Sequence, residues 1–140
     1  MFEVIANNLD FNFTLIGRGW EYSEIFDQML KLPNFTYLEF TFPTYLDCLE
    51  KNHIFLSLST LEGGPLPMLE TMACNLIPVC IATGWVTDLI QHGQNGYILS
   101  KNCSIADVRE FLISAMKREL NTRNSIKQYS YERYLNNFLS

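Results

Sequence analysis

Residues 53–82 read HIFLSLSTLEGGPLPMLETMACNLIPVCIA and pass from one kind of local pattern to another and back. The runs 53–59 and 77–82 are short and apolar, which is typical of strands covered on both faces of a parallel sheet. Between them a loop rich in glycine and proline leads into 66–74, where Pro67 suits the first turn of a helix. Two strands joined by a helical crossover form a right-handed βαβ unit. This stretch therefore predicts a Rossmann-like α/β layer.

The same alternation extends in both directions along the chain. Further strands are expected at 11–17, 35–40 and 97–99, with helices at about 45–51 and 86–92 and terminal helices over about 104–139, roughly 104–119 and 130–139. An amphipathic helix is expected at about 21–31, with one apolar side formed by Ile25, Phe26, Met29 and Leu30. Together they predict one domain over residues 1–140, a three-layer α/β/α fold with a mostly parallel sheet of about five strands. The chain opens in a helix-like stretch and lacks the usual first strand of such a fold. We therefore expect a fragment, a split subunit or half of something larger.

Composition and charge limit the classes of function. The net charge of −5 over 140 residues argues against nucleic-acid binding, which needs clustered cations. No apolar run approaches the roughly 18 residues of a membrane span, and the N-terminus lacks the basic region of a secretory signal. A cytoplasmic protein is expected. Residues 117–140 hold five of the ten Lys and Arg but two of the fifteen acids. Such residues more often simply solvate a terminal helix and suit its C-terminal dipole end; the less favoured alternative is a weak contact with the cytoplasmic membrane face.

The four cysteines show none of the spacings typical of metal ligands, so no metal site is expected. Three of them stand among apolar neighbours and are expected to be buried as small hydrophobic residues.

The loop after the strand at 53–59 carries the candidate site. Glu62 and Glu70 stand on either side of Gly63 and Gly64, at the carboxyl end of a strand, where ligands bind in open α/β sheets. Paired glycines let the backbone approach a ligand closely, and the following helix N-terminus suits a phosphate. The two carboxylates could accept hydrogen bonds from sugar hydroxyls. The alternative is an ordinary connection in which Glu62 caps an amide and Glu70 is solvated, and spacing alone favours neither.

The order of the residues adds a second argument. The chain has Ser59-x-x-Glu62-Gly63-Gly64-Pro65, then Leu69-Glu70-Thr71-Met72-Ala73-Cys74-Asn75, then Pro78-Val79. This resembles the donor-binding motif of the group 1 glycosyltransferases of GT-B fold, the large retaining family 4. The family's pattern runs Ser-x-x-Glu-Gly-Phe-Gly, then Leu-Glu-Ala-Met-Ala-Cys-Gly-x-Pro-Val-Val. The segments 15–20 and 82–99 also follow the family's order, so the resemblance covers nearly the whole chain. It implies the C-terminal, donor-binding half of a GT-B fold.

The resemblance also implies roles for individual residues. Glu70 would hold the ribose hydroxyls of a nucleotide-sugar, and Glu62, the catalytic candidate, would face the donor sugar. The remaining donor-binding candidates form three groups. The backbone amides around Gly63, Gly64 and Leu66 would cradle the diphosphate. The nucleotide would lie against the loop formed by Gly17, Arg18 and Gly19, and the segment Phe40–Thr41 would border the base. Arg18 would contact phosphate or base, although an exposed loop arginine is more often simply solvated.

Four departures from the family pattern bear on these roles. The Arg and Lys that clamp the diphosphate in the family are absent, as is the acceptor-binding domain. Gly64-Pro65 replaces Phe-Gly and keeps the loop prone to turn. Asn75 replaces a glycine at the end of the motif helix, where asparagine tolerates the left-handed conformation.

The implied function is transfer of a sugar from a nucleotide-sugar, with a UDP-sugar as the expected donor, with retention and without a metal or other cofactor. The expected partners are the nucleotide-sugar, an acceptor-binding domain or subunit, and a second copy of the chain at an exposed sheet edge. Alone, the chain is expected to be inactive. The alternative is a degenerate, non-catalytic GT-B-like module that binds a nucleotide or a protein. A third reading, another enzyme such as a sugar-nucleotide epimerase, has no specific residue in its favour.

Overall fold

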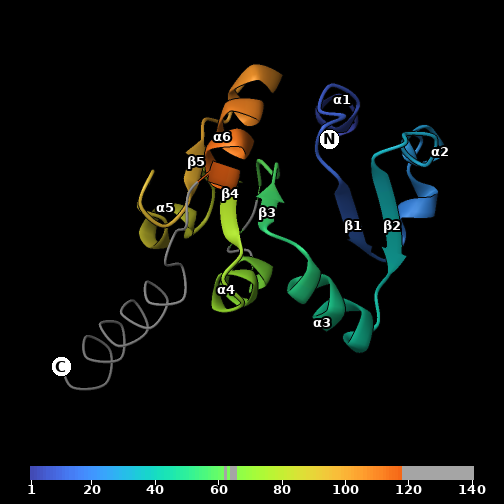
Figure 1. The fold of residues 1–140 in the computed structure, drawn as a ribbon, viewed down its shortest axis with the longest axis horizontal. Coiled ribbons are helices and arrows are strands. Elements are labelled where there is room, and N and C mark those ends of the chain that lie inside the picture. Colours follow the sequence, from blue (N-terminus) through green and yellow to red (C-terminus); the bar gives the residue numbers. More distant parts are fainter. Residues whose placement is uncertain (62, 64–65, 118–140) are drawn as a thin grey trace. The chain divides into compact units, whose positions relative to one another are not determined.

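The computed structural model describes residues 1–61, 63 and 66–117, which alternate between helices and strands (Figure 1). The elements are α1 (Phe2–Ala6), β1 (Phe13–Gly17), the 3-10 turn η1 (Trp20–Tyr22), α2 (Phe26–Met29), β2 (Phe35–Glu39), α3 (Phe42–Lys51), β3 (Ile54–Ser57), α4 (Leu66–Ala73), β4 (Ile77–Ile81), α5 (Val86–Leu89), β5 (Tyr97–Leu99) and α6 (Ile105–Lys117). The predicted α/β fold is confirmed. The helical stretch expected near 130–139 lies outside the described residues.

The chain divides into two compact units, the first spanning Met1–Lys51 and the second beginning at Asn52. The five described strands pair as β1-β2 in the first unit and as β3-β4-β5 in the second, and every pairing is parallel. The predicted number of strands and their parallel direction are confirmed, whereas their hydrogen bonds form two sheets and not one. The single domain over 1–140 stays a prediction.

In the first unit, a buried asparagine ties the opening helix to the sheet. The Asn34 side-chain amide donates to the carbonyls of Ile5 and Asn8, both at 3.0 Å, and of Phe11 at 3.1 Å. The backbone carbonyl of Asn34 accepts a hydrogen bond from the Phe13 amide at 2.8 Å. Because a buried backbone carbonyl without a partner is costly, these bonds fix the path of the chain from α1 into β1. β1 and β2 then run in register and end together at the same edge.

The helix expected at about 21–31 is shorter and interrupted. Ser23 is extended, with φ −85° and ψ 130°, so η1 and α2 are separate. Phe26 and Met29 of α2 are buried, but Ile25 and Leu30, expected on the same side, are 38% and 50% exposed. The prediction of one continuous amphipathic helix is therefore wrong here.

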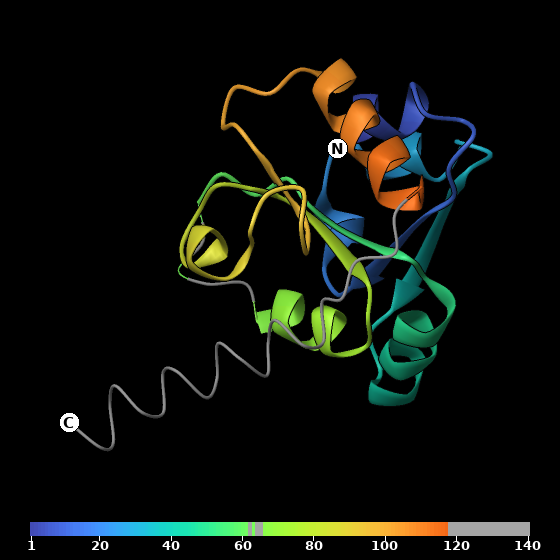
Figure 2. The ribbon, with the colours of Figure 1, turned by 60° about the vertical axis from the view of Figure 1, so that its left-hand side comes forward.

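In the second unit, both faces of the sheet are covered. All five residues of β4 are buried, and α4 and α6 lie on opposite sides of that strand (Figures 1 and 2). On one side, Tyr97 of β5 stacks on Phe111 of α6, with ring centroids 5.3 Å apart. On the other side is a cluster from α4, β4, α5 and the residue after it: Met68, Met72, Cys80, Val86, Leu89 and Ile90. The apolar run at 77–82 predicted this arrangement correctly, whereas all four residues of β3, from the run at 53–59, are partly exposed.

Of the four cysteines, all free thiols, only Cys80 is buried. Burial raises the pKa of the Cys80 thiol to about 12, so this side chain packs as a neutral hydrophobic group. Cys74 is exposed, and Cys48 and Cys103 are partly exposed. The expectation that three cysteines are buried is wrong, because apolar neighbours in sequence do not fix which face of a helix or loop a residue occupies.

A reciprocal cap starts α6. The Ser104 amide and hydroxyl donate to the Asp107 carboxylate at 2.7 and 2.8 Å, and the Asp107 amide donates to the Ser104 hydroxyl at 3.2 Å. These bonds satisfy N–H groups that the helix leaves unpaired. The backbone and side-chain bonds from Ser104 lower the pKa of the Asp107 carboxyl.

We predict that Ser104→Ala lowers the free energy of unfolding by about 1 kcal/mol at neutral pH, as loss of an N-cap does. Because folding lowers the pKa of the Asp107 carboxyl, the contribution of this carboxylate to the free energy of unfolding is present above its unfolded-state pKa of about 3.9. That contribution is lost as the pH falls through the folded-state pKa. Urea unfolding at pH 7 and pH 3 should show a smaller difference between variant and wild type at pH 3. Thr87→Ala, which removes an exposed hydroxyl on α5, is the control and should change neither value. An equal loss at both pH values would contradict the coupling.

Within the described residues, no helix is both long enough and apolar enough to cross a bilayer.

Candidate functional site

The ends of β1 and β2 are joined at their carboxyl edge. The Gly17 carbonyl accepts the Phe40 amide and the Tyr37 hydroxyl, both at 3.0 Å. Because the pairing is parallel and in register, the loop after β1 and the segment after β2 begin side by side. The structure thus brings together two of the predicted donor-binding segments, Gly17–Gly19 and Phe40–Thr41.

Arg18 bridges these two segments. Its Nε and Nη2 both donate to the Phe40 carbonyl, at 3.3 and 3.1 Å. Its guanidinium carbon lies 5.7 Å from the centroid of the Phe40 ring, within the range of a cation–π contact. The ring of Phe40 packs in turn on Tyr45 of α3, with centroids 5.6 Å apart. The exposed arginine is therefore engaged with its own chain.

The two glycines of the loop have local structural reasons to be glycine. Gly19 has φ +78°, in the left-handed region that L side chains rarely adopt. A Cβ on Gly17 would stand 2.9 Å from Nε1 of Trp20, so the missing side chain makes room for the indole. Their roles toward a nucleotide stay predictions.

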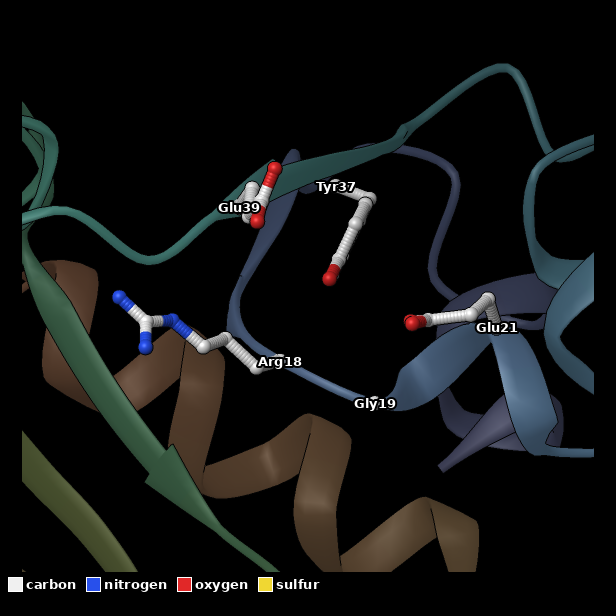
Figure 3. A pocket seen from close by; sticks show the side chains of 5 residues that line it. All are labelled: Arg18, Gly19, Glu21, Tyr37 and Glu39. Atoms are coloured by element: carbon white, nitrogen blue, oxygen red, sulfur yellow. The ribbon is translucent and has the colours of Figure 1, made fainter.

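A pocket of about 400 Å³ lies at this edge, lined by Arg18, Gly19, Glu21, Tyr37 and Glu39 (Figure 3). Arg18 and Glu21 stand on either side of Gly19, while Tyr37 and Glu39 come from β2 (Figure 3). Desolvation by burial, followed by the charges of Glu21 and Glu39, raises the pKa of the Tyr37 hydroxyl. The phenol therefore stays protonated at neutral pH and donates to Gly17.

The site residues predicted from the sequence do not include Glu21, Tyr37 or Glu39. One signal was available for the last two. They alternate along the expected strand at 35–40, so their side chains leave the same face near its carboxyl end. No sequence pattern indicated Glu21. Its position depends on the 3-10 turn η1, whereas a continuous helix was expected at 21–31.

The second unit holds the remaining predicted residues. Glu70 lies one turn after Leu66, which begins α4, and both side chains are exposed, as is Gly63 in the preceding loop. This loop follows the carboxyl end of β3, as predicted. Glu62 and Gly64 lie outside the described residues, so the catalytic assignment of Glu62 and the cradle role of Gly64 stay predictions.

The end of α4 confirms the interpretation of Asn75. Its φ is +67°, and among the residues that the structure describes it is the one non-glycine residue with a positive φ. Its amide donates to the Met72 carbonyl and the Leu76 amide donates to the Thr71 carbonyl, both at 2.9 Å. This pair of bonds is the Schellman ending of a helix, in which glycine or asparagine occupies the left-handed position. Asparagine thus keeps the geometry of the glycine it replaces.

Over the described part of the chain, no group of three or more His, Cys, Asp or Glu side chains is placed to hold a metal ion. Metal independence itself stays a prediction.

The model of the family described as glycosyl transferases group 1 matches residues 1–133. The chain belongs to this family. An uncharacterized glycosyltransferase of Methanocaldococcus jannaschii is 26% identical over 137 residues, which are 90% of this chain and 38% of that protein. The group 1 resemblance inferred from the motif around Glu70 is therefore confirmed.

Solved structures support the fold of this group 1 chain. The crystal structure of TarM superposes with a TM-score of 0.77 at 26% identity, covering 99% of this chain and 30% of TarM. The Anabaena protein HepE superposes with a TM-score of 0.63 at 15% identity, covering 92% of this chain and 40% of HepE. The chain thus spans less than half the length of these relatives. The predicted likeness to the C-terminal half of a GT-B fold is confirmed.

Proposed function

We propose that this chain supplies the nucleotide-sugar-binding side of a retaining, metal-independent glycosyltransferase. In this proposal Glu70 accepts hydrogen bonds from the ribose hydroxyls and Glu62 faces the donor sugar. The amides near Gly63 and Leu66, with the N-terminal end of α4, favour the developing negative charge on the leaving diphosphate. Sugar transfer then requires an acceptor-binding domain or subunit.

The observation that carries the proposal is the family match over 1–133, combined with the place of Glu70. The second glutamate of the motif is exposed on α4, directly after the loop that follows β3. A carboxylate in that place can meet a ligand without first being uncovered. The structures of HepE with UDP and glucose, and of a TarM mutant with UDP, support uridine as the base.

Calorimetric titration of the 140-residue chain with UDP, GDP and ADP tests the proposal. We expect UDP to bind with a Kd between about 1 μM and 1 mM, the usual range for enzyme substrates, and the other two to bind more weakly. Absence of binding by all three would contradict a donor site on this chain. Binding without sugar transfer, once an acceptor-binding domain of a relative is supplied, would favour the non-catalytic module.

A further inference from the structure

We propose that Arg18 is a positioning residue: it holds the Phe40–Thr41 segment in place for the nucleoside end of the donor and does not bind the phosphates. This inference rests on the proposed function. It concerns which part of a nucleotide is affected by Arg18, and it differs from the phosphate or base contact that the sequence suggested.

The guanidinium of Arg18 is engaged with its own chain through two hydrogen bonds to Phe40. Two of the five N–H donors of a guanidinium are directed at one acceptor, the Phe40 carbonyl, at 3.3 and 3.1 Å. The same group lies 5.7 Å from the centroid of the Phe40 ring. The side chain is thus held at its charged end by a single neighbouring residue. An arginine that binds phosphate presents its planar fork to the ligand.

The side chains around Arg18 in the pocket carry more negative than positive charge. Glu21 and Glu39 line the same pocket as Arg18, so the side chains that line it carry two negative charges and one positive charge at neutral pH (Figure 3). A diphosphate entering this pocket would meet two like charges. An uncharged nucleoside, with hydroxyl and N–H donors, meets hydrogen-bond acceptors there instead. The pocket's charge therefore favours the nucleoside end over the phosphates.

The neighbouring backbone shows how Arg18 acts at a distance. Phe40 is held on one side by its amide, which donates to the Gly17 carbonyl, and on the other by Arg18. Next along the chain, the Thr41 hydroxyl accepts the Thr44 amide at 3.2 Å and so caps α3. Removal of Arg18 frees the Phe40 carbonyl and loosens the segment between β2 and this cap.

Titrations followed by two-dimensional amide NMR on the 140-residue chain test the proposal. Uridine, UMP and UDP are added to wild type, Arg18→Ala, Arg18→Lys and Lys31→Ala. The last variant removes an exposed cation of the same unit and controls for net charge. We expect Arg18→Ala to weaken all three ligands by the same factor, about fivefold to tenfold, as loss of a charged hydrogen bond at a partly solvated site does. Arg18→Lys should recover part of the loss, and Lys31→Ala should bind as wild type.

Two results would overturn the proposal. A loss that grows from uridine to UMP to UDP would make Arg18 a phosphate ligand. In the ligand-free chain, unchanged amide signals of Phe40, Thr41 and Thr44 in Arg18→Ala would show that Arg18 does not hold this segment. The second measurement needs no nucleotide. If wild type binds none of the three ligands, the proposed function fails, and the ligand-free signals still decide whether Arg18 fixes the segment.

Discussion

Replacement of Glu70 by alanine should weaken the binding of UDP by about 10- to 100-fold. Hydrogen bonds to a charged group contribute about 1.5–3 kcal/mol, and each 1.4 kcal/mol corresponds to a factor of ten in affinity. Two ribose hydroxyls held by one carboxylate place the expected loss in the upper part of that range. Calorimetric titration of the variant beside wild type gives the factor directly.

The fold should tolerate this change. Glu70 is exposed on α4, and alanine has a higher intrinsic helix propensity than glutamate. The temperature of unfolding is therefore expected to stay near that of wild type, so that lost binding reports on the site itself. Glu70→Gln keeps one acceptor oxygen, so its affinity for UDP should lie between the affinities of wild type and Glu70→Ala.

Glu110→Ala provides the matched control, because Glu110 is an exposed glutamate on α6 in the same unit. It removes the same charge from another helix and should leave UDP affinity unchanged. If Glu70→Ala bound UDP as tightly as wild type, the ribose role of this residue would be wrong. Equal losses in both variants would instead indicate a general effect of net charge.

Local chemistry explains which parts of the structure the sequence predicted. The apolar runs that became β3 and β4, and the glycine- and proline-rich loop before α4, are local signals, and the structure follows them closely. Asn75 was interpreted correctly for the same reason, since the left-handed position at a helix end depends on adjacent residues. The group 1 motif around Glu70 is also contiguous in sequence, and the family match confirms what it implied.

Features that depend on contacts between distant segments were not predictable in this way. The pocket at the ends of β1 and β2 needs the register of Gly17 with Glu39, which no periodicity specifies. The link from Arg18 to the Phe40 carbonyl joins residues 22 positions apart. Likewise, the interruption at Ser23 could not be derived from an apolar pattern that suits a continuous helix.

The reason for glycine at position 96 is likewise a contact with a distant segment of the chain, with Pro78 on β4. An Asn-Gly pair such as Asn95-Gly96 is typical of a turn, in which glycine usually serves to adopt a positive φ. In the structure the positive φ belongs to Gly93, at +76°, and not to Gly96. A Cβ on Gly96 would instead lie 2.6 Å from Cγ and 2.8 Å from the carbonyl oxygen of Pro78 on β4. Glycine is required here because two backbones approach each other closely.

We therefore predict that Gly96→Ala lowers the free energy of unfolding of the chain by about 1–3 kcal/mol, the usual cost of overpacking, and that the value falls in the upper half of that range. Real Cβ atoms essentially never come within 3.0 Å of such neighbours, and here one neighbour is a backbone carbonyl of a fully buried strand. Neither the carbonyl of Pro78 nor its ring can move aside without shifting β4. Urea unfolding of the variant, followed by circular dichroism, measures the loss.

Gly63→Ala is the matched control, because a Cβ there would meet no heavy atom within 4 Å in the described structure. Its free energy of unfolding should stay within about 0.5 kcal/mol of wild type, as is usual for surface substitutions. If Gly96→Ala were as stable as this control, the close approach of Pro78 would not be what requires glycine at 96. A loss in Gly96→Ala alone would show that this residue keeps β4 and β5 at their native spacing, and with them the sheet that carries α4 and Glu70.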